Sequence, residues 1–386
     1  MAERAATGRS QAPLRVVVAG AGIAGLEAAA ALRDLAGDRV RLTLIAPEPR
    51  FVQRALEPYG SFGITPPPPV AIATLTRQLD AVLVADRLAW VDRDARTVHC
   101  RSGAIHRFEG LVLALGARTG TRYDHAITLD DTAAQELRKL TADVLAARVR
   151  RVALIAPERM AWPLPLYEAA LMIAARAAEH RCELALTLIT AEAAPLQAFG
   201  DRASEQMATL LAEHDIELHT DALCDVPAPG HVTVMSVGAH RPTELAVDRV
   251  LALPELFGPH VRGLPCAPYG FIPIDRFCRV VGMSTIYAAG DGTDYPIKHG
   301  GIAAQQADVA GACIAAAAGA DVRAAPFQPT IEGTLLTGGR PRHLSARLTG
   351  RQPFHSAMTV ALGDAPATPA KLTAPHLSAL LQELSG

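Results

Sequence analysis

Three glycines near the amino end, Gly20, Gly22 and Gly25, constrain the fold of this chain more than any other feature. They follow an apolar, β-branched run, Leu14 to Val18, and precede an alanine-rich segment, Leu26 to Leu35, that is expected to be helical. With this spacing, the first glycine permits a tight turn, the second lets the backbone approach a pyrophosphate, and the third lets helix and strand pack closely. The pattern therefore predicts a helix whose free N–H groups face the phosphates of a nucleotide.

The rest of the chain continues the alternation of strands and helices. Arg41 to Ile45 is expected to be a second strand, which completes a βαβ unit. Another unit starts at Arg151, and its expected strands and helices are Val152 to Ile155, Leu166 to His180, Leu184 to Ile189 and Ala203 to His214. Alternating strands and helices favour parallel sheets. We therefore predict an α/β protein with two Rossmann-like units and a small C-terminal segment.

The length of 386 residues is enough for two or three domains. Four consecutive prolines, Pro66 to Pro69, predict an extended connector, because proline fits neither a helix interior nor a central strand. The expected division is a disordered leader at 1–13, a discontinuous first nucleotide-binding domain at 14–125 and 270–325, a second nucleotide-binding domain at 126–269 and a C-terminal interface segment at 326–386.

Charge and hydropathy exclude several classes of partner. The formal net charge is -2 and no long basic run is present, which argues against nucleic acid, because phosphate binding needs a concentrated cationic face. The sequence has no uninterrupted stretch of about 18 apolar residues, so no transmembrane helix is predicted. Residues Met1 to Pro13 lack the apolar core of a secretory signal.

The cysteines give no sign of a disulfide framework or a metal site. Six are present, none forms Cys-x-x-Cys, and no spacing matches a set of metal ligands. We expect reduced thiols, no metal and a cytoplasmic location.

Four motifs, in a fixed order, point to one family. They are the glycine loop, the segment Gly110 to Ala117 with Gly116, the segment Asp248 to Pro254, and the segment Ile286 to Asp291 with Gly290. Together they resemble the FAD-dependent pyridine nucleotide–disulphide oxidoreductase superfamily, especially its branch of sulfide:quinone oxidoreductases and type II NADH dehydrogenases. The resemblance covers about residues 14–320 and implies a flavoprotein oxidoreductase with FAD as cofactor. It also implies two Rossmann-like FAD/NAD(P)-binding domains, each in three layers (β/β/α). The discontinuous domain at 14–125 and 270–325 would bind FAD, and the domain at 126–269 would be NAD(P)-binding-like.

The resemblance assigns cofactor-binding roles to particular residues. Asp291 matches the aspartate that binds the ribityl chain, and a carboxylate is a good acceptor for sugar-like hydroxyls. Arg54 lies in a segment that is beside the flavin in the family, where it would meet the pyrophosphate; a surface arginine is the alternative. The expected cofactor-binding residues are Gly20, Gly22, Ala24, Gly25, Glu48, Arg54, Gly116, Gly290, Asp291, Gly300 and Gly301.

Glu48 enters this set by position. An acidic residue is expected at the end of the second strand to bind ribose hydroxyls. Ala46 occupies the usual position, and Glu48 follows two residues later. The alternative is a solvated carboxylate in a loop.

Three residues are candidates for catalysis or tuning: Lys298, His299 and Glu168. In the family, the helix after Lys298 and His299 points its N-terminus at the flavin pyrimidine edge, where its dipole favours the anionic reduced state. Glu168 matches a helix glutamate that type II NADH dehydrogenases use near the nicotinamide. It is equally suited to a first helical turn, where the dipole favours a carboxylate. Gln305 and Gln306 match a quinone-site motif only loosely.

The chain departs from the family pattern in two places. The strand Val152 to Ile155 is not followed by a glycine loop, and Pro157, Pro163 and Pro165 cannot donate N–H groups to phosphate. The segment between Cys100 and Cys182 has no cysteine, so the thiol chemistry of sulfide oxidation is not expected. Both NAD(P)H binding and sulfide oxidation are therefore in question.

The segment Lys371 to Leu384 has leucines at helical spacing. Relatives use such helices to dimerise or to lie on a membrane, which would make the protein a homodimer or place it at the inner face of the membrane. The alternative is a helix packed on its own domain.

Three functions remain open from sequence. The first is an FAD enzyme that passes two electrons or a hydride from a small donor to a quinone or another small acceptor. The second is an NAD(P)H-dependent reductase of an electron-carrier protein. The third is a flavin-binding sensor without turnover.

Overall fold

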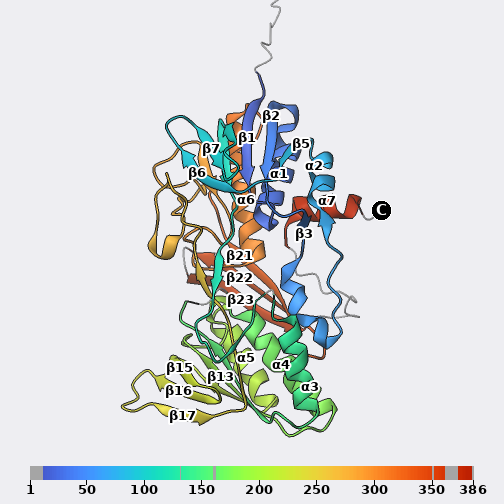
Figure 1. Cartoon of the computed structure of the whole chain (residues 1–386), viewed down its shortest axis with the longest axis vertical. Coiled ribbons are helices and arrows are strands. Elements are labelled where there is room, and N and C mark those ends of the chain that lie inside the picture. The colour runs from blue at the N-terminus through green and yellow to red at the C-terminus, as the bar shows by residue number, and fades with distance from the viewer. Residues whose placement is uncertain (1–11, 131, 160–161, 350–351, 361–372, 385–386) are drawn as a thin grey trace, which may run out of the picture.

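The computed structural model describes residues 12–130, 132–159, 162–349, 352–360 and 373–384. Most of the expected leader and residues 361–372 lie outside these ranges. Two α/β units lie at opposite ends of the molecule, and a small antiparallel sheet from the C-terminal region lies between them (Figure 1).

The first unit is built on a five-stranded sheet in the order β20-β9-β1-β2-β5, with every neighbouring pair parallel. Its strands are β1 (Leu14–Ala19), β2 (Val40–Ile45), β5 (Ala81–Val84), β9 (Gly110–Leu113) and β20 (Ile286–Ala288). The last strand enters this sheet after the chain has built the whole second unit, so the first unit is closed from both ends of the sequence.

Alternating side chains of β1 pack into two different layers. Val16 and Val18 face helices α1 (Ile23–Ala36) and α6 (Gly300–Ala317). Val17 and Ala19 face the opposite layer. This layer is an antiparallel meander of β6 (Leu88–Asp92), β7 (Thr97–Cys100) and β8 (Ile105–Arg107). A strand buried on both faces needs an unbroken apolar run, which Val16 to Ala19 of β1 supply.

The second unit repeats the same three layers. Its sheet has the order β11-β18-β12-β13-β14, again all parallel. The strands are β11 (Ile127–Thr128), β12 (Arg151–Ala156), β13 (Ala185–Thr190), β14 (Ile216–His219) and β18 (Arg249–Ala252). Helices α3 (Ala134–Leu145), α4 (Leu164–Glu179) and α5 (Asp201–Glu213) cover one face, and the meander β15 (Ala222–Ala228), β16 (His231–Ser236) and β17 (Thr243–Ala246) covers the other. The predicted fold class, with two Rossmann-like units, is confirmed.

Short elements connect the two units. β10 (Arg118–Gly120) pairs antiparallel with β19 (Glu255–Phe257). The segment that leads into the second unit and the segment that leaves it therefore lie side by side. Within the first unit, β3 (Arg50–Phe51) pairs with β4 (Val70–Ala71), which leads into α2 (Ile72–Gln78). A 3-10 segment, Arg54–Phe62, and the proline connector lie between β3 and β4.

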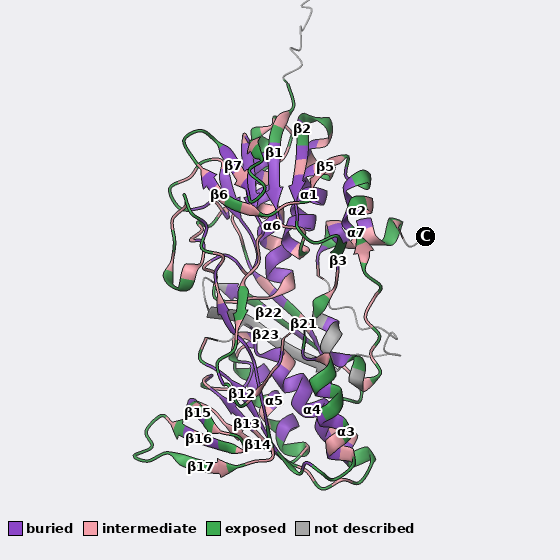
Figure 2. Cartoon of the chain, in the orientation of Figure 1, coloured by how far each residue is buried: buried purple, intermediate pink, exposed green. Residues whose placement is uncertain are grey.

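The C-terminal region forms an antiparallel sheet of β21 (Thr330–Leu335), β22 (Arg342–Thr349) and β23 (Gln352–Val360), an element that the sequence did not predict. The apolar side chains of β21 and β22 belong to the core of the second unit, and the opposite face of these two strands turns toward the first unit. Figure 2 shows that burial is concentrated in the two parallel sheets and in the helices that face them.

Helix α7 (Pro375–Glu383) packs on α1 of the first unit. Leu377 is fully buried and Leu380 is nearly so, and both belong to the core beneath α1 and α6. The described part of the C-terminal segment therefore takes the second of the two expected forms, a helix packed on its own domain. None of the helices within the described residues is long and apolar enough to cross a membrane.

Candidate active site

A cavity of about 750 Å³ lies where the first unit, the second unit and the C-terminal sheet meet. This volume is typical of ligand and cofactor sites. The first unit contributes the carboxyl ends of β1, β9 and β20 and the start of α1 and α6. The other two walls come from the start of α4 and from β21 and β22.

The glycine loop forms one edge of this cavity. Gly20 has φ +109°, and a Cβ there would lie 2.0 Å from the carbonyl oxygen of Ala114. A Cβ on Gly25 would lie 1.9 Å from the carbonyl oxygen of Gly20. Gly22 is the N-cap of α1, lines the cavity, and its Cβ would meet nothing within 4 Å. The helix N-terminus is therefore exposed to open space wide enough for a phosphate.

The carboxyl ends of β9 and β20 form the next edge. Gly116 has φ +68° and borders the same open space. Gly290 has φ +84°, and a Cβ there would lie 3.2 Å from the Cβ of Ala24 on α1 and 3.3 Å from that of Ala303 on α6. The glycine therefore lets the two helices approach the end of β20, and the structure brings Gly116, Gly290 and Ala24 together as one surface.

Asp291 lines the cavity immediately after Gly290, and burial raises the pKa of its carboxyl above the ordinary value. Lys298 lies behind it, outside the cavity lining, with Nζ 4.1 Å from the ring centre of Phe271 and donating to the carbonyl of Thr293. Burial lowers the pKa of Lys298 to about 8, against the opposing effect of Asp291 and Asp294. Lys298 therefore interacts electrostatically with Asp291 from outside the cavity lining.

Helix α6 begins at the cavity with His299 as its N-cap. The Nδ1 atom of His299 accepts the N–H of Gly301 at 3.2 Å, so the neutral ring carries its proton on Nε2. The ring packs against Trp162 with centroids 5.0 Å apart. Capping of α6 and packing on Trp162 explain the position of His299, although its ring also borders the cavity.

Thr373 adds a polar group to the start of α6. Its Oγ1 would lie 2.2 Å from a Cβ on Gly301, so only glycine fits there. This oxygen is buried and has no hydrogen-bond partner within the described residues, although it lines the cavity. A buried hydroxyl without a partner is costly, which fits a ligand that supplies one.

Arg54 and Glu48, both expected to bind cofactor, take different positions. Arg54 begins the 3-10 segment and lines the cavity. Glu48 lies outside the lining, is half-exposed, and pairs with Arg87 at 3.4 Å between Oε1 and Nη2. The structure therefore brings Arg54, but not Glu48, to the cavity.

Glu168 is fully buried in the first turns of α4 and borders the cavity. Its carboxylate accepts the hydroxyl of Tyr59 at 2.7 Å and the N–H of Leu336 at 2.9 Å. Burial and the nearby Glu168 raise the pKa of Tyr59 well above its ordinary value, so the tyrosine stays neutral. One carboxylate therefore joins α4, the 3-10 segment and the end of β21.

Gln305 holds the opposite end of β21. Its Nε2 donates to the carbonyl of Thr330 at 2.7 Å, and its Oε1 accepts the N–H of Thr330 at 2.9 Å. Gln306 is fully buried, and its Oε1 accepts the N–H of Gly290 at 2.8 Å. Both glutamines thus position backbone, a role that the sequence pattern did not reveal.

The crevice of the second unit is bridged by its own side chains. Arg159 follows β12, and its Nη2 lies 2.7 Å from Oε2 of Glu255, which follows β18. Arg122 reaches the same carboxylate at 3.8 Å. These loops flank the point where the strand order reverses, which is the usual place for a nucleotide. The remaining space there is about 130 Å³.

Glu192 occupies the position after β13 where a ribose-binding carboxylate is expected. It is buried, and it accepts the hydroxyl of Tyr167 at 2.8 Å and that of Thr190 at 3.2 Å. Burial raises the pKa of Glu192 to about 7. Its oxygens therefore serve the core of the second unit.

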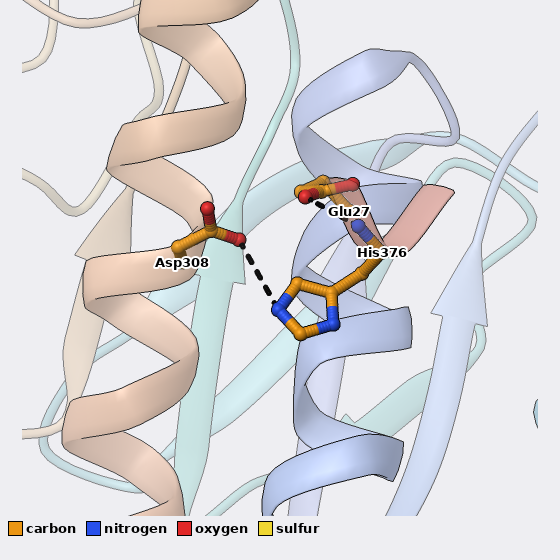
Figure 3. Close-up of side chains that lie close together, drawn as sticks. All are labelled: Glu27, Asp308 and His376. Carbon is orange, nitrogen blue, oxygen red and sulfur yellow. Dashed lines mark hydrogen bonds and ion pairs between the residues drawn. The ribbon is translucent and has the colours of Figure 1, made fainter. Parts of the chain in front are cut away.

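A separate group of ionisable side chains lies on α1, α6 and α7 (Figure 3). Glu27 accepts the N–H groups of His376 and Leu377 and so caps α7. His376 pairs through Nδ1 with Asp34 and lies 4.0 Å through Nε2 from Asp308. Burial and Glu27 raise the pKa of Asp308 to about 7. Glu27, Asp308 and His376 lie close enough to hold a metal ion, but their contacts already account for the docking of α7.

Sequence reasoning missed the polar wall of the cavity. Glu332, Thr334, His343 and Ser345 line it from β21 and β22. A strand pattern is present at Ile331 to Leu335, but its apolar residues needed a partner surface that only the folded second unit supplies.

The comparisons agree with this architecture. The family described as pyridine nucleotide-disulphide oxidoreductase matches residues 168–311. No curated protein matches the sequence. A sulfide:quinone oxidoreductase from the hyperthermophilic bacterium Aquifex aeolicus shares the fold with a TM-score of 0.78 and 20% identity, over 90% of this chain and 87% of that one.

Two further solved structures are similar. A ferredoxin reductase from Rhodopseudomonas palustris has a TM-score of 0.64 and 21% identity, over 87% of this chain and 83% of that one. NDH2 from Plasmodium falciparum, in complex with NADH, has a TM-score of 0.58 and 16% identity, over 72% of this chain and 64% of that one. The family match over residues 168–311 and the shared fold confirm the resemblance to this oxidoreductase family.

We predict that Glu168 stabilises the folded protein. Replacing Glu168→Ala removes the carboxylate that accepts from two buried donors, which should cost about 2–5 kcal/mol of unfolding free energy. Urea unfolding checks this, with Glu179→Ala at the exposed end of the same helix as the control. An unchanged midpoint for Glu168→Ala would contradict the structural role.

We predict a stability change with pH that depends on Glu192. Because its folded pKa, about 7, exceeds the ordinary 4.5, the folded state binds the extra proton between these values. Stability should therefore fall as pH rises from 4.5 through 7. Glu192→Gln should remove up to about 3 kcal/mol of this fall, and Glu183→Gln, which is exposed, should not. Asp308 contributes in the same direction, so the slope should persist in part.

Proposed function

We propose that this chain, an oxidoreductase related to the pyridine nucleotide–disulphide family, binds FAD and passes two electrons through it to a quinone or another small acceptor. The observation that carries the proposal is the single cavity that joins the glycine loop and Asp291 to a wall from the C-terminal sheet. One part of it suits a dinucleotide, and the other leaves room for a second substrate.

The residues at the cavity edge fit FAD. The N–H groups at the start of α1, beside Gly22, would bind the pyrophosphate. Arg54 would add positive charge there. Asp291, whose carboxylate opens into the cavity, would accept the hydroxyls of the ribityl chain. FAD bound in this way would supply the two-electron chemistry.

The start of α6 would serve the ring end of the cofactor. Its N-terminus carries a partial positive charge, which favours negative charge on a nearby ligand. Thr373 Oγ1 lacks a partner within the described residues and is available to bind a carbonyl oxygen there. Lys298 holds positive charge behind Asp291. Together these groups would favour a cofactor state that carries more negative charge.

Several features argue against a nicotinamide nucleotide as the electron donor. The bridge between Arg159 and Glu255 spans the crevice of the second unit, and Glu192 is committed to Tyr167. The N-cap of α4 is Pro163, and Pro165 follows in its first turn, so two N–H groups are missing where a phosphate would bind. We infer a donor that reaches the flavin cavity directly.

The cavity also argues against thiol chemistry. Within the described residues, no cysteine lines it.

The burial of Leu377 and Leu380 against α1 leaves neither leucine for a membrane surface. We therefore propose a cytoplasmic protein whose donor and acceptor are small molecules that enter this cavity.

We predict that the purified protein is yellow and contains about one FAD per chain. NADH and NADPH should each fail to bleach the flavin in anaerobic stopped flow, whereas dithionite should bleach it and a quinone should restore its absorption. Bleaching by NADH or NADPH would favour a reductase of an electron-carrier protein. Reduced flavin that no quinone reoxidises would favour a sensor. A colourless protein that also fails to bind added FAD would refute the proposal.

We predict that Asp291→Ala weakens FAD binding by roughly 10- to 100-fold, because it removes charge-assisted hydrogen bonds. Gly22→Val should lower flavin content further, because its side chain projects into the space beside the helix N-terminus. Glu48→Ala is the matched control and should retain FAD, since Glu48 lies outside the cavity lining. Flavin fluorescence during titration of apoprotein measures each affinity.

A further inference from the structure

Strand β21 crosses the cavity between two anchors. At one end, the Gln305 side chain of α6 makes two hydrogen bonds to the backbone of Thr330. At the other, Glu168 of α4 accepts the N–H of Leu336. Gln305 lies in the second turn of α6, so the amino end of the strand is fixed beside the helix start that faces the cavity. The strand is therefore held in place by both units.

The side chains of β21 and β22 separate into two faces. Ile331 and Leu335 are fully buried in the core of the second unit, together with Leu344 of the partner strand. Because successive side chains of a strand alternate, Glu332 and Thr334 must face the other way. They line the cavity.

The register of the sheet adds two more polar groups to this face. Glu332 is opposite Ser345, and Thr334 is opposite His343. Residues directly opposite in an antiparallel pair lie on the same face with Cβ atoms about 5 Å apart. His343 and Ser345 also line the cavity, and both are exposed to it, as is Glu332. A carboxylate, an imidazole and a hydroxyl are thus gathered on one wall.

This wall lies at the α6 end of the cavity. Glu332 follows the anchored Thr330 by two residues, which is about 7 Å along a strand. The glycine loop and Arg54 line the cavity at the start of α1 and in the 3-10 segment, where the pyrophosphate is proposed to bind. With the ring end of the cofactor at the start of α6, as proposed above, a second substrate placed against the wall would meet that end.

We propose that Glu332, His343 and Ser345 bind the electron acceptor, and that His343 gives it a proton. The inference rests on the proposed function and names its acceptor class: a small, neutral quinone with hydrogen-bonding oxygens. Ser345 and His343 donate hydrogen bonds to the oxygens of the quinone. Glu332 accepts the hydroxyl of the hydroquinone product and repels anionic acceptors.

The reaction balances for such an acceptor. The quinone gains a hydride equivalent, two electrons and one proton, from the reduced cofactor, which is thereby oxidised. The second proton comes from protonated His343, which becomes neutral and recovers a proton from solvent through the open side of the cavity. Histidine is suited to this role near neutral pH.

Binding tests the wall without turnover. Isothermal titration calorimetry of oxidised holoprotein with duroquinone, whose ring has no free position for thiol addition, should show affinity losses of roughly 5- to 10-fold for His343→Ala and Ser345→Ala. Arg347→Gln is the matched control, because Arg347 is exposed on the same strand and lies outside the cavity lining. Affinities equal to that of the control would overturn the proposal.

Reoxidation tests the proton. After reduction by dithionite, His343→Ala should be reoxidised by duroquinone about 10²- to 10⁴-fold more slowly than wild type, and added imidazole should restore part of the rate. Glu332→Gln should favour a sulfonated naphthoquinone over duroquinone by several-fold relative to wild type, because it removes a negative charge.

Different outcomes refute the role of the wall and the proposed function. If His343→Ala and Glu332→Gln match Arg347→Gln in rate and acceptor preference while all retain flavin, the wall has no role in acceptor chemistry and the inference is wrong. A wild-type protein that neither contains flavin nor binds added FAD would instead refute the proposed function.

Discussion

The close approach of three backbone segments at Gly20, Gly25 and Ala114 is the constraint on which the site depends. A Cβ at Gly20 would lie 2.0 Å from a carbonyl oxygen, and one at Gly25 would lie 1.9 Å from another, far inside normal contact distance. With hydrogen there instead, β1, β9 and α1 meet, and the N-terminus of α1 opens toward the cavity with no side chain at Gly22. Gly290 repeats this solution for α6 at the end of β20. Two helix termini therefore face one cavity, which explains why the first unit needs strands from both ends of the chain.

Buried polar groups then fix the C-terminal sheet across this cavity. An unpaired carboxylate at the position of Glu168 would be strongly destabilising, yet Tyr59 and the N–H of Leu336 satisfy it. Gln305 does the same for Thr330 with both ends of its amide. Because these bonds join segments from both units and the C-terminal region, they are directional in a way that apolar packing is not. They set which face of β21 turns to the cavity.

The parts of this structure that the sequence predicts are those with local causes. The strands and helices of both units follow from apolar runs, glycines and prolines within windows of about ten residues, and α7 follows from its leucine spacing. The partners of Glu168 were out of reach, because Tyr59 and Leu336 lie 109 and 168 positions away. Glu48 shows a different limit: its position after β2 fits a ribose ligand, but its side chain pairs with Arg87 and lies outside the cavity lining.

The second unit shows how a nucleotide-binding fold can persist after its own crevice has been bridged. Its sheet order and layers match those of the first unit, although Arg159, Glu255 and prolines occupy the switch point between β12 and β18. What it still provides is an apolar surface that buries Ile331 and Leu335, and a tryptophan, Trp162, that packs on the N-cap of α6. Both contacts shape the cavity of the other unit. The second unit therefore supports the wall of this cavity through packing.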